Sequence, residues 1–589
     1  MSSELINYST GTTVPASWLN RTQLREEGLA AYAVYSAGGT FFSKALMPSG
    51  IDYSGTSLAG ATNPVQQAIN ALNSLGGGRI HFKGPATYDF TTGQPAPVGF
   101  PIPSGFPGGV GLVLYPNIKI EGDGRGTILT TTTAVASNND YFSMFVNKDF
   151  STDDGFIEIR DLAVILPSPT QTATGMQAWD DTVIFYGAHD SIIDHVYTEN
   201  GSFQFYPNSV YLNTANALSL GNNFNNKIVH CTSKNQTGNT AFFQQTDSWF
   251  VFNRIFHTWD DGFIIASAGT GNKVIGNIVD GGVVVTNKGA ATACIYLQND
   301  GAVGSGPTSG VLQDNIIAFN TCKNHVKNNG SQAGIYELAG RNNIYDRNIC
   351  SGNAGPGLKL EQCDHMRVNG GQYYNNGKPG INVLQNLSGT LYDLQIDGAY
   401  VYNNGTVPSP QSGIDISVTA GNFLQDIVVS NCIVYEDQGG AIQPNGIRLG
   451  LDGTLSNLLL TGNNLKRQST PIAIQGTGTV TGRAINNSGY NPFGLRSNAY
   501  DNTNNIIGVL GTSSTLTSAK TYTCQFVPLD LYLGGGTVTA MTKNGSTIGS
   551  GTSILPATTA TTALVHLEPG DTWSITFSVT PATQLVFGL

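Results

Sequence analysis

The sequence predicts an all-β protein built around a right-handed parallel β-helix. A Gly followed by a short alternating apolar strand recurs at Gly334, Gly357 and Gly380, at intervals of 23 and 23 residues, and at Gly413 and Gly446, at intervals of 33 and 33. A period of about 20 to 50 residues made of strands and turns is typical of a solenoid whose units bury their apolar faces by stacking. Parallel connections of this kind are right-handed.

Two features inside the repeat favour strands over helices. Ile414 and Ile416 share one side of their strand, whereas Asp415 takes the other side. A second strand that begins and ends in Asn follows in several units, as in 272–277 and 315–320, and its side-chain amides can satisfy a turn and stack on the next coil. We therefore expect one inward column of side chains, made of Ile335, Leu358, Ile381, Ile414 and Ile447.

The predicted elements follow one another along the chain. Residues 1–50 carry mixed signals and are interpreted as an N-terminal attachment arm. Residues 51–495 are the β-helix, which opens with a helix that has Asn63 as its cap and Pro64 in its first turn, and that covers the exposed first coil. After a linker rich in Ser and Asn, alternating strands in 505–589 predict a small C-terminal β-sandwich.

Composition excludes several classes of partner. Only 11% of the 589 residues are charged, the net charge is -11, and no cluster of Lys and Arg exists to neutralise phosphates, so we expect no nucleic-acid partner. The sequence has no apolar run of membrane-spanning length and no start of the signal-peptide type. It therefore predicts no membrane insertion and no export by the general secretory route.

The cysteines predict neither a metal site nor a disulfide framework. The seven Cys form no pair with metal-ligand spacing, and we expect no metal and no cofactor. Four of them fall in the second strand or its turn in different coils, which favours a partly buried column of thiols over disulfides or metal ligands. These are Cys231, Cys322, Cys350 and Cys432.

The start of the predicted β-helix carries a resemblance. The segments 51–56, 64–75 and 77–82, followed by Tyr88, resemble the opening of the pectate-lyase-like right-handed β-helix superfamily, which includes many viral tailspikes. In that superfamily the corresponding words are an Asp-Tyr-Gly start, an Ala-Ile-Asn-Ala helix and a Gly-Gly pair before a strand. The resemblance implies the fold over residues 50–490. It does not select an activity, because the scaffold carries lyases, hydrolases, epimerases and inert binders.

A short sequence motif, an Asp-Asp pair that we call the Asp-Asp word, adds a candidate for catalysis. The segment 257–265 resembles the polygalacturonase family, in which an Asp-Asp pair supplies the acid and the base for inverting glycoside hydrolysis. The resemblance implies these roles for Asp260 and Asp261, with Trp259 beside them as a substrate-binding ring. Asp-Asp-Gly is also ordinary turn chemistry, and the Asp-Asp word recurs at 180–181. A structural turn is therefore the alternative.

The outward positions of the repeat supply a second candidate site. With each Gly counted as position one, the third position holds Tyr336, Lys359, Asn382, Asp415 and Arg448, which would form a polar stripe about 20 Å long. The fifth position holds Glu361, which we place about 9.6 Å from Asp415 at Cα as a second carboxylate pair. Lys359 and Arg448 could hold acidic sugars. The alternative is a solvated outer face with incidental charge.

The sequence favours a virion-surface spike that recognises host glycans. We expect it to bind a host polysaccharide or glycoprotein glycan, to attach to other virion proteins through its N-terminal arm, and to form a homotrimer. Glycan cleavage by a hydrolase or lyase mechanism stays open. One alternative is a free, extracellular polysaccharide-degrading enzyme of the polygalacturonase or pectate-lyase type, and another is a structural surface protein without catalysis.

Overall fold

The computed structural model describes most of the chain after residue 30. The described residues are 31–47, 49–90, 94–95, 109–131, 140–148, 154–167, 178–206, 223–236, 239–258, 261–266, 269–281, 292–299, 312–326, 332–386, 389–406, 409–437, 442–465, 468, 470–485, 487, 505–506, 518, 520–524, 529–534, 537–550, 563–568, 571–579 and 583–588. The chain divides into two compact units, Met1–Trp259 and Asp260–Leu589. Each unit contains coils of stacked parallel strands.

The first unit begins with a cap on the β-helix. Strands β1 (Ala31–Ala37) and β2 (Thr40–Ala45) pair with each other, and β1 also pairs in parallel with β4 (Gly78–Phe82). Strand β3 (Tyr53–Gly55) pairs with β2, and the short 3-10 helix η1 (Gly60–Thr62) follows. The residues from 31 onward in the predicted arm therefore take part in the first sheet, whereas 1–30 lie outside the described residues.

The predicted capping helix is present as α2 (Pro64–Ser74), the one α-helix in the described part of the chain. Its Asn63 cap accepts hydrogen bonds from the backbone N–H groups of Val65 and Gln66, at 2.9 and 3.3 Å, which satisfies donors that a helix start leaves unpaired. The apolar face of α2 is fully buried, since Ile69 and Leu72 have no exposed surface. The cap thus covers apolar surface that an open first coil would leave in water.

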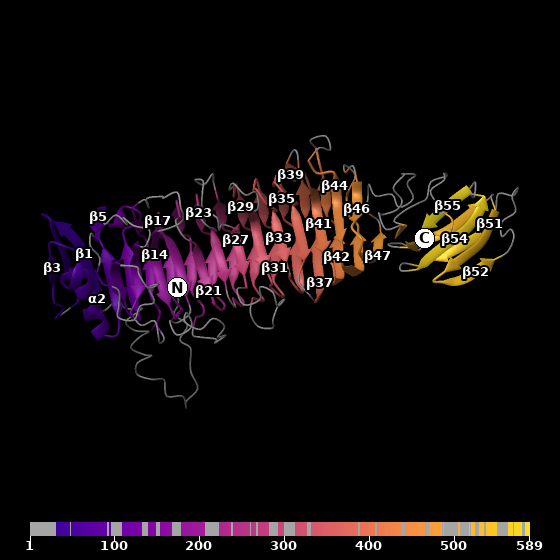
Figure 1. Ribbon diagram of the computed structural model, residues 1–589. Coiled ribbons are helices and arrows are strands. Elements are labelled where there is room, and N and C mark those ends of the chain that lie inside the picture. The colour runs from indigo at the N-terminus through magenta and orange to yellow at the C-terminus, as the bar shows by residue number, and fades with distance from the viewer. Residues whose placement is uncertain are drawn as a thin grey trace, which may run out of the picture. The chain divides into compact units, whose positions relative to one another are not determined.

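The coils of the first unit contribute strands to three sheets, which we call A, B and C (Figure 1). Sheet A contains β4, β8 (Ile118–Gly122), β12 (Glu158–Arg160), β16 (Ile192–Asp194), β19 (Lys227–Val229) and β22 (Trp249–Val251). Sheet B contains β5 (Ala86–Asp89), β9 (Thr127–Thr130), β13 (Ala163–Ile165), β17 (Tyr197–Glu199), β20 (Thr232–Lys234) and β23 (Arg254–Phe256). Sheet C contains β6 (Gln94–Pro95), β7 (Gly109–Leu114), β10 (Asp140–Asn147), β14 (Ala178–Tyr186), β18 (Ser202–Tyr206) and β21 (Thr240–Phe243), and β11 (Asp154–Gly155) pairs separately with β15 (Ala188–His189).

The second unit has the same three-sheet coil. Sheet C contains β24 (Phe263–Ala266), β27 (Ala293–Gln298), β30 (Ala333–Leu338), β33 (Leu358–Glu361), β36 (Ile381–Gln385), β41 (Ser412–Val418), β44 (Asn445–Leu451) and β46 (Thr470–Gln475). Sheet A contains β25 (Lys273–Ile275), β28 (Ile316–Ala318), β31 (Ile344–Asp346), β34 (Met366–Asn369), β37 (Thr390–Asp397), β42 (Phe423–Ser430), β45 (Thr454–Thr461) and β47 (Thr479–Ile485). Sheet B contains β26 (Ile278–Asp280), β29 (Thr321–Lys323), β32 (Ile349–Ser351), β35 (Gln372–Tyr374), β38 (Tyr400–Tyr402) and β43 (Ile433–Tyr435), and β39 (Gly405–Thr406) pairs with β40 (Ser409–Pro410).

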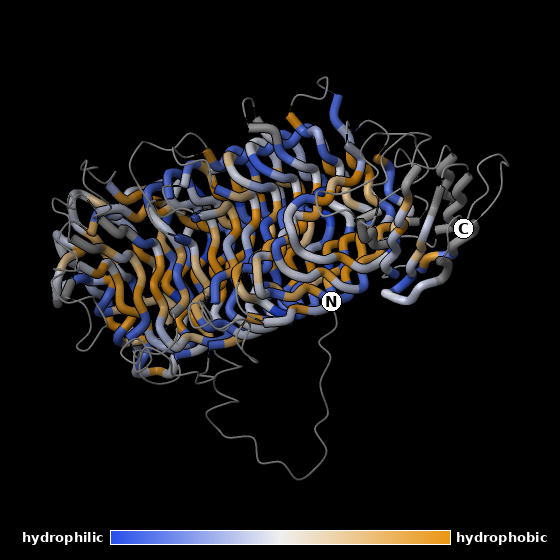
Figure 2. The backbone as a smooth tube through the Cα atoms, turned by 45° about the vertical axis from the view of Figure 1, so that its right-hand side comes forward, coloured by the Kyte–Doolittle hydropathy of each residue, from blue (hydrophilic) through white to orange (hydrophobic). Residues whose placement is uncertain are grey.

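The strand register confirms the predicted inward column. The five residues are consecutive partners across β30, β33, β36, β41 and β44, and none has exposed surface. They are Ile335, Leu358, Ile381, Ile414 and Ile447. Hydrophobic and hydrophilic residues alternate along the coils, as a strand with one buried face requires (Figure 2). The predicted all-β fold, a right-handed parallel β-helix, is thereby confirmed.

The asparagine stacking is confirmed as well. Asn272 Nδ2 donates to Asn315 Oδ1 at 3.1 Å, and Asn315 Nδ2 donates to Asn343 Oδ1 at 3.0 Å. A second ladder runs in the same way from Asn277 through Asn320 to the next coil. These amides are fully buried, and each satisfies backbone groups at a corner between two strands. The ladders therefore fix where each coil turns.

The four cysteines that the sequence analysis singled out are buried free thiols, and they occupy two kinds of position. Cys322 and Cys350 are direct partners in β29 and β32 of sheet B. Cys231 and Cys432 instead lie at corners, where their N–H groups donate to an Asn side chain of the next coil. Burial raises the pKa of Cys231 and of Cys432 to about 12. These thiols are consequently protonated and unreactive at neutral pH.

The C-terminal part of the second unit is the predicted small β-domain. One sheet contains β48 (Asn505–Ile506), β49 (Lys520–Cys524), β54 (Thr572–Val579), β51 (Thr537–Lys543) and β52 (Ser546–Ser550), and the other contains β53 (Ala563–Leu567), β50 (Leu529–Gly534) and β55 (Thr583–Gly588). Asn544 and Gly545 both have positive φ, 51° and 76°, and form the predicted hairpin turn between β51 and β52. Trp573 and Ile575 are fully buried in this domain. Among the described residues, no helix has the length and apolar character needed to cross a membrane.

Candidate functional site

The predicted outward stripe exists in the second unit. Its residues are direct partners in register across β30, β33, β36, β41 and β44, namely Tyr336, Lys359, Asn382, Asp415 and Arg448. Tyr296 of β27 extends the column by one coil at its start. The adjacent column holds Glu361, Leu384, Ser417 and Gly450, and ends at Gln475. We call these two columns the outward stripe.

One half of the outward stripe centres on Glu361. The Tyr336 hydroxyl donates to Glu361 Oε2 at 2.5 Å, Lys359 Nζ contacts the same oxygen at 2.5 Å, and Asn386 Nδ2 donates to Oε1 at 2.6 Å. Lys359 Nζ also lies 4.3 Å from the centroid of the Tyr336 ring, whose other neighbour is the stacked ring of Tyr296 at 5.0 Å. Three side chains from two flanking coils and its own strand thus orient one carboxylate.

The electrostatics of Glu361 follow from these partners. Burial alone would raise its pKa, since the residue is 8% exposed, but the hydrogen bonds from Lys359 and Tyr336 hold the pKa below the ordinary value. Burial and the carboxylate together raise the pKa of Tyr336 far above its usual range. At neutral pH Glu361 is therefore an anion and Tyr336 a neutral donor. An ionised carboxylate can accept hydrogen bonds or stabilise a positive charge, but it has no proton to give.

The other half of the outward stripe centres on Asp415. Arg448 Nη1 contacts Asp415 Oδ2 at 2.7 Å, and Ser417 Oγ donates to Oδ1 at 2.8 Å. Arg448 Nε also donates to Gln475 Oε1 at 2.8 Å. The side chain of Arg448 is 31% exposed, whereas Asp415 is 5% exposed. The outer surface here consists of guanidinium, amide and hydroxyl groups.

The two carboxylates of the second predicted pair share a face but lie in different columns of it, and their catalytic role stays a prediction. Glu361 is in register with Ser417, and Asp415 is in register with Lys359, so the carboxylates lie two coils apart and also in different columns. Adding the offset of two residues along the strand places their Cα atoms about 12 Å apart instead of about 9.6 Å. Glu361 also contacts Tyr336 in the preceding coil, whereas Asp415 contacts Arg448 in the following one. The sequence estimate had left out the offset along the strand.

The Asp-Asp word lies partly outside the described residues. Asp260 and Trp259 belong to the residues that the structure does not describe. Asp261 is 3% exposed, and its Oδ1 accepts hydrogen bonds from the backbone N–H groups of Thr292 and Ala293, at 2.5 and 2.6 Å. This contact ties one coil to the next and is the kind that the turn interpretation predicts. A catalytic role for Asp260 or Asp261 stays a prediction.

The related word at 180–181 leads to a comparable arrangement in the first unit. Asp181 of β14 is 1% exposed, and its Oδ1 accepts hydrogen bonds from Ser202 Oγ and from Gln204 Nε2, the latter at 3.0 Å. Both donors belong to β18, the next strand of sheet C. The second Asp of each word therefore joins consecutive coils by hydrogen bonds.

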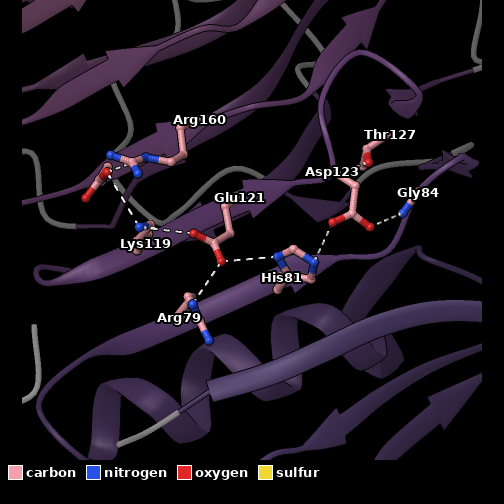
Figure 3. Close-up of polar contacts among 9 residues, drawn as sticks. Arg79, His81, Gly84, Lys119, Glu121, Asp123, Thr127 and Arg160 are labelled. Atoms are coloured by element: carbon pink, nitrogen blue, oxygen red, sulfur yellow. Dashed lines mark hydrogen bonds and ion pairs between the residues drawn. The ribbon is translucent and has the colours of Figure 1, made fainter. Parts of the chain in front are cut away.

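A second polar cluster lies on the outward side of sheet A in the first unit (Figure 3). Glu121 Oε1 contacts Arg79 at 3.2 Å and His81 at 3.1 Å, while Oε2 contacts Lys119 at 3.0 Å. His81 Nε2 lies 3.0 Å from Asp123 on the other side. Burial would raise the pKa of Glu121, but the cations around it lower the pKa overall. This cluster links the first coils through charge pairs across neighbouring strands.

Sequence reasoning missed three side chains that complete the outward stripe: Tyr296, Asn386 and Gln475. Cys294 stands where this coil would have its starting Gly, and Tyr296 lies 40 positions before its partner Tyr336. The short apolar run of 293–297, with an aromatic residue two positions after the place of the Gly, was the signal that could have found it. Asn386 follows the end of its strand, and Gln475 occupies the fifth position of a coil that has Pro471 in place of the starting Gly.

The comparisons with known proteins concern similarity of structure. No protein-family model matches the chain. No curated protein matches it either. Among solved structures it is similar to the tailspike protein of the E. coli bacteriophage HK620, with a TM-score of 0.43 and 11% identity over 89% of this chain and 88% of that one.

Two further solved structures are similar to this chain. The catalytic domain of a GH87 alpha-1,3-glucanase has a TM-score of 0.40 and 14% identity, covering 74% of this chain and 70% of that one. The A-module of the Azotobacter vinelandii mannuronan C-5 epimerase AlgE6 has a TM-score of 0.36 and 14% identity, covering 72% of this chain and 93% of that one. The fold of the present chain itself is established by its own strand pairings, those of a parallel β-helix.

Proposed function

We propose that this protein is a glycan-recognising β-helix, and that the outward stripe of the second unit is its contact surface. The observation that carries the proposal is the continuous register of Tyr336, Lys359, Asn382, Asp415 and Arg448. Donors and acceptors repeat there at the strand spacing of about 4.8 Å, over about 20 Å in all. A linear polysaccharide, which repeats hydroxyl groups along its length, matches such a row.

The charge of the outward stripe favours a neutral glycan. Lys359 is paired with Glu361, and Arg448 is paired with Asp415, so the two cations are balanced by two anions. An acidic sugar would have to displace a carboxylate at 2.5 or 2.7 Å from its cation. The hydroxyl groups of a neutral sugar can instead bond to Asn382, Arg448 and Gln475 without breaking either pair. We therefore propose neutral glycans in place of the acidic sugars that Lys359 and Arg448 suggested.

The same contacts favour binding over cleavage at this surface. Glycoside hydrolysis needs one protonated and one ionised carboxylate on either side of the scissile bond. Here each carboxylate contacts a cation, Glu361 with Lys359 at 2.5 Å and Asp415 with Arg448 at 2.7 Å, and these contacts favour the ionised form over a proton donor. We propose recognition as the role of the outward stripe and leave hydrolase or lyase chemistry to Asp260 and Asp261.

The test is binding of oligosaccharides by the full chain. Calorimetric titration with neutral and acidic oligosaccharides of matched length should show binding of the neutral ones, and product analysis should show them intact. Asn382→Ala and Arg448→Gln should each weaken binding about 10-fold, because each removes about 1 to 2 kcal/mol of hydrogen bonding. Gln372→Ala is the matched control, since Gln372 is an exposed amide on sheet B.

Two outcomes would contradict the proposal. Unchanged affinity in both stripe variants would place recognition elsewhere, and tighter binding of the acidic fragments would reject the neutral specificity. Cleavage that Asp261→Asn abolishes while binding persists would assign catalysis to the Asp-Asp word. Cleavage that Glu361→Gln abolishes would instead make the outward stripe an active site.

We further propose that the protein acts on a virion surface as a homotrimer, with residues 1–30 contacting other virion proteins. The observations that support this are a β-helix with a covered first coil and a separate C-terminal β-domain that can serve association. Light scattering should give a trimer for the full chain and a smaller species for a chain ending at Gly494. A full-length monomer at micromolar concentration would reject the assembly.

A further inference from the structure

Two histidines and an aspartate converge on the outer surface of the first unit, outside every site described above. Asp194 is the last residue of β16, His195 follows it, and His230 follows β19, the neighbouring strand of sheet A. One ligand atom from each residue lies within 4.8 Å of the others. Asp194 Oδ1 is 2.6 Å from His195 Nδ1 and 3.1 Å from His230 Nδ1.

The fold itself brings these groups together. Both histidines have φ of 53° and occupy the same one-residue turn between sheets A and B in consecutive coils. The repeated turn stacks the imidazoles, with centroids 4.6 Å apart, and the ring of Phe252 stacks on the other side of His230 at 5.8 Å. The backbone turn itself does not require a histidine, because Gly370 and Gly398 adopt the same turn in the second unit with φ of 63° and 68°.

We propose that Asp194, His195 and His230 bind a divalent transition-metal ion, with Zn²⁺ the best match. Two imidazole nitrogens and one carboxylate oxygen form a ligand set that suits Zn²⁺ and Cu²⁺ and does not suit Mg²⁺ or Ca²⁺. Both Nδ1 atoms already point at one carboxylate oxygen, so small side-chain rotations admit an ion at about 2.0 to 2.2 Å from each ligand. The ion would join two successive coils.

Accessibility and charge are compatible with this site. The side chains of His195 and His230 are 56% and 47% exposed, so the ion enters from solvent and keeps water ligands. When Nδ1 binds metal, the ring proton moves to Nε2, where water can accept its hydrogen bond. Arg160 is the register partner of Asp194, and its charge is offset by Glu158, which contacts it at 2.7 Å.

The test uses the full chain without a polyhistidine tag. Calorimetric titration with ZnCl₂ should give one site per chain of micromolar affinity, weakened at least 10-fold in His195→Asn and in His230→Asn. Asparagine is chosen because it tolerates the left-handed turn. His257→Gln, which removes an exposed histidine outside the cluster, should leave Zn²⁺ binding unchanged.

A second measurement keeps the proposal testable if either variant folds poorly. Cu²⁺ bound to the wild-type chain should show hyperfine coupling to two imidazole nitrogens in its electron paramagnetic resonance spectrum. Coupling to a single nitrogen, or Zn²⁺ affinities within threefold of wild type in both cluster variants, would overturn the site. Equal losses in His257→Gln and in the cluster variants would show adventitious binding and would overturn it as well.

Discussion

Glu337 and Glu361 lie in adjacent strands of sheet C, one facing the core and one facing outward, and they show what a cation adds to a buried carboxylate. Each accepts hydrogen bonds from one tyrosine hydroxyl and one asparagine amide: Tyr345 and Asn343 for Glu337, and Tyr336 and Asn386 for Glu361. Glu361 alone also contacts a cation, Lys359. The two sites differ in that charge and in their depth.

The two pKa values move in opposite directions. Burial raises the pKa of Glu337 to about 7, although Tyr345 and Asn343 act against the shift. At Glu361 burial acts in the same direction, but Lys359 and the neutral donors together lower the pKa. Two neutral hydrogen bonds therefore do not offset full burial of a carboxylate, whereas a cation at partial exposure does. At neutral pH the inner carboxylate, Glu337, therefore lowers the stability of the folded chain, whereas the outer one, Glu361, raises it.

The largest expected effect tests the inner donors. Asn343→Ala removes the donor to Glu337 and the acceptor for Asn315, all fully buried, so it should lower the free energy of unfolding by about 3 kcal/mol or more. Asn386→Ala removes the equivalent donor on the outer side, where water can replace it, and should cost less than about 1 kcal/mol. Urea denaturation at pH 7 measures the free energy of unfolding of both variants. Equal losses in the two variants would show that the inner and the outer donor do not differ in their contribution to stability.

The next effect concerns pH. Between about pH 4.5 and 7 the unfolded chain ionises Glu337 while the folded chain keeps it protonated, so the stability of the wild-type chain falls as pH rises through this window. Glu337→Gln removes this loss and should be more stable than wild type at pH 8, by on the order of 2 kcal/mol. At pH 4 the advantage should vanish. Urea midpoints at both values check the prediction, and an advantage of the same size at pH 4 would contradict it.

The outer carboxylate should behave in the opposite sense. Because the pKa of Glu361 is lowered on folding, its contribution is present above the ordinary carboxyl pKa and is lost as pH falls through the folded value. Glu361→Gln should therefore destabilise the chain at pH 7 and leave it unchanged in strong acid. The same urea series measures this variant, and greater stability than wild type at pH 7 would reverse the assignment.

The smallest effect isolates the cation. A double-mutant cycle of Lys359→Met and Glu361→Gln should give a coupling energy of about 1 kcal/mol at pH 7, because the pair is partly exposed to solvent. A cycle of Lys359→Met with Asp415→Asn is the control and should give coupling near zero, since Asp415 contacts Arg448 instead. Comparable coupling energies in both cycles would show that Lys359 interacts with the negative charge around it in general and not specifically with Glu361.

Repetition determined which parts could be predicted from the sequence. Side chains alternate with a period of two and coils recur at readable intervals, so the inward column and the stripe from Tyr336 to Arg448 followed from counting. The helix cap followed from Asn63 and Pro64, whose side-chain chemistry is local. Glu337 lies on the core side of its strand, where the register is unbroken.

Two kinds of contact could not be predicted. One depends on how far apart two side chains lie along their strands, and the other forms between side chains of different sheets or coils. The separation of Glu361 from Asp415 depends on which column each occupies, a detail that spacing along the chain hides. The partners of Glu337 come from sheet A, and their approach depends on how side chains of different sheets meet inside the coil. The pair of His195 and His230 is separated by 35 residues and becomes visible only when both are assigned to the same turn.

The asparagine ladders also determine where the chain can change length. In the coils that begin at 315, 343, 366 and 394, a segment of ten residues carries sheets A and B between equivalent corners and ends just before 325, 353, 376 and 404. The rest of each coil varies, with 18, 13, 18 and 23 residues before the next segment begins. That variable part contains the sheet C strand and the outward stripe. Insertions and deletions in the variable part can therefore change the outward surface, while the constant segment preserves the strand register. Recognition can then diverge without a change of fold.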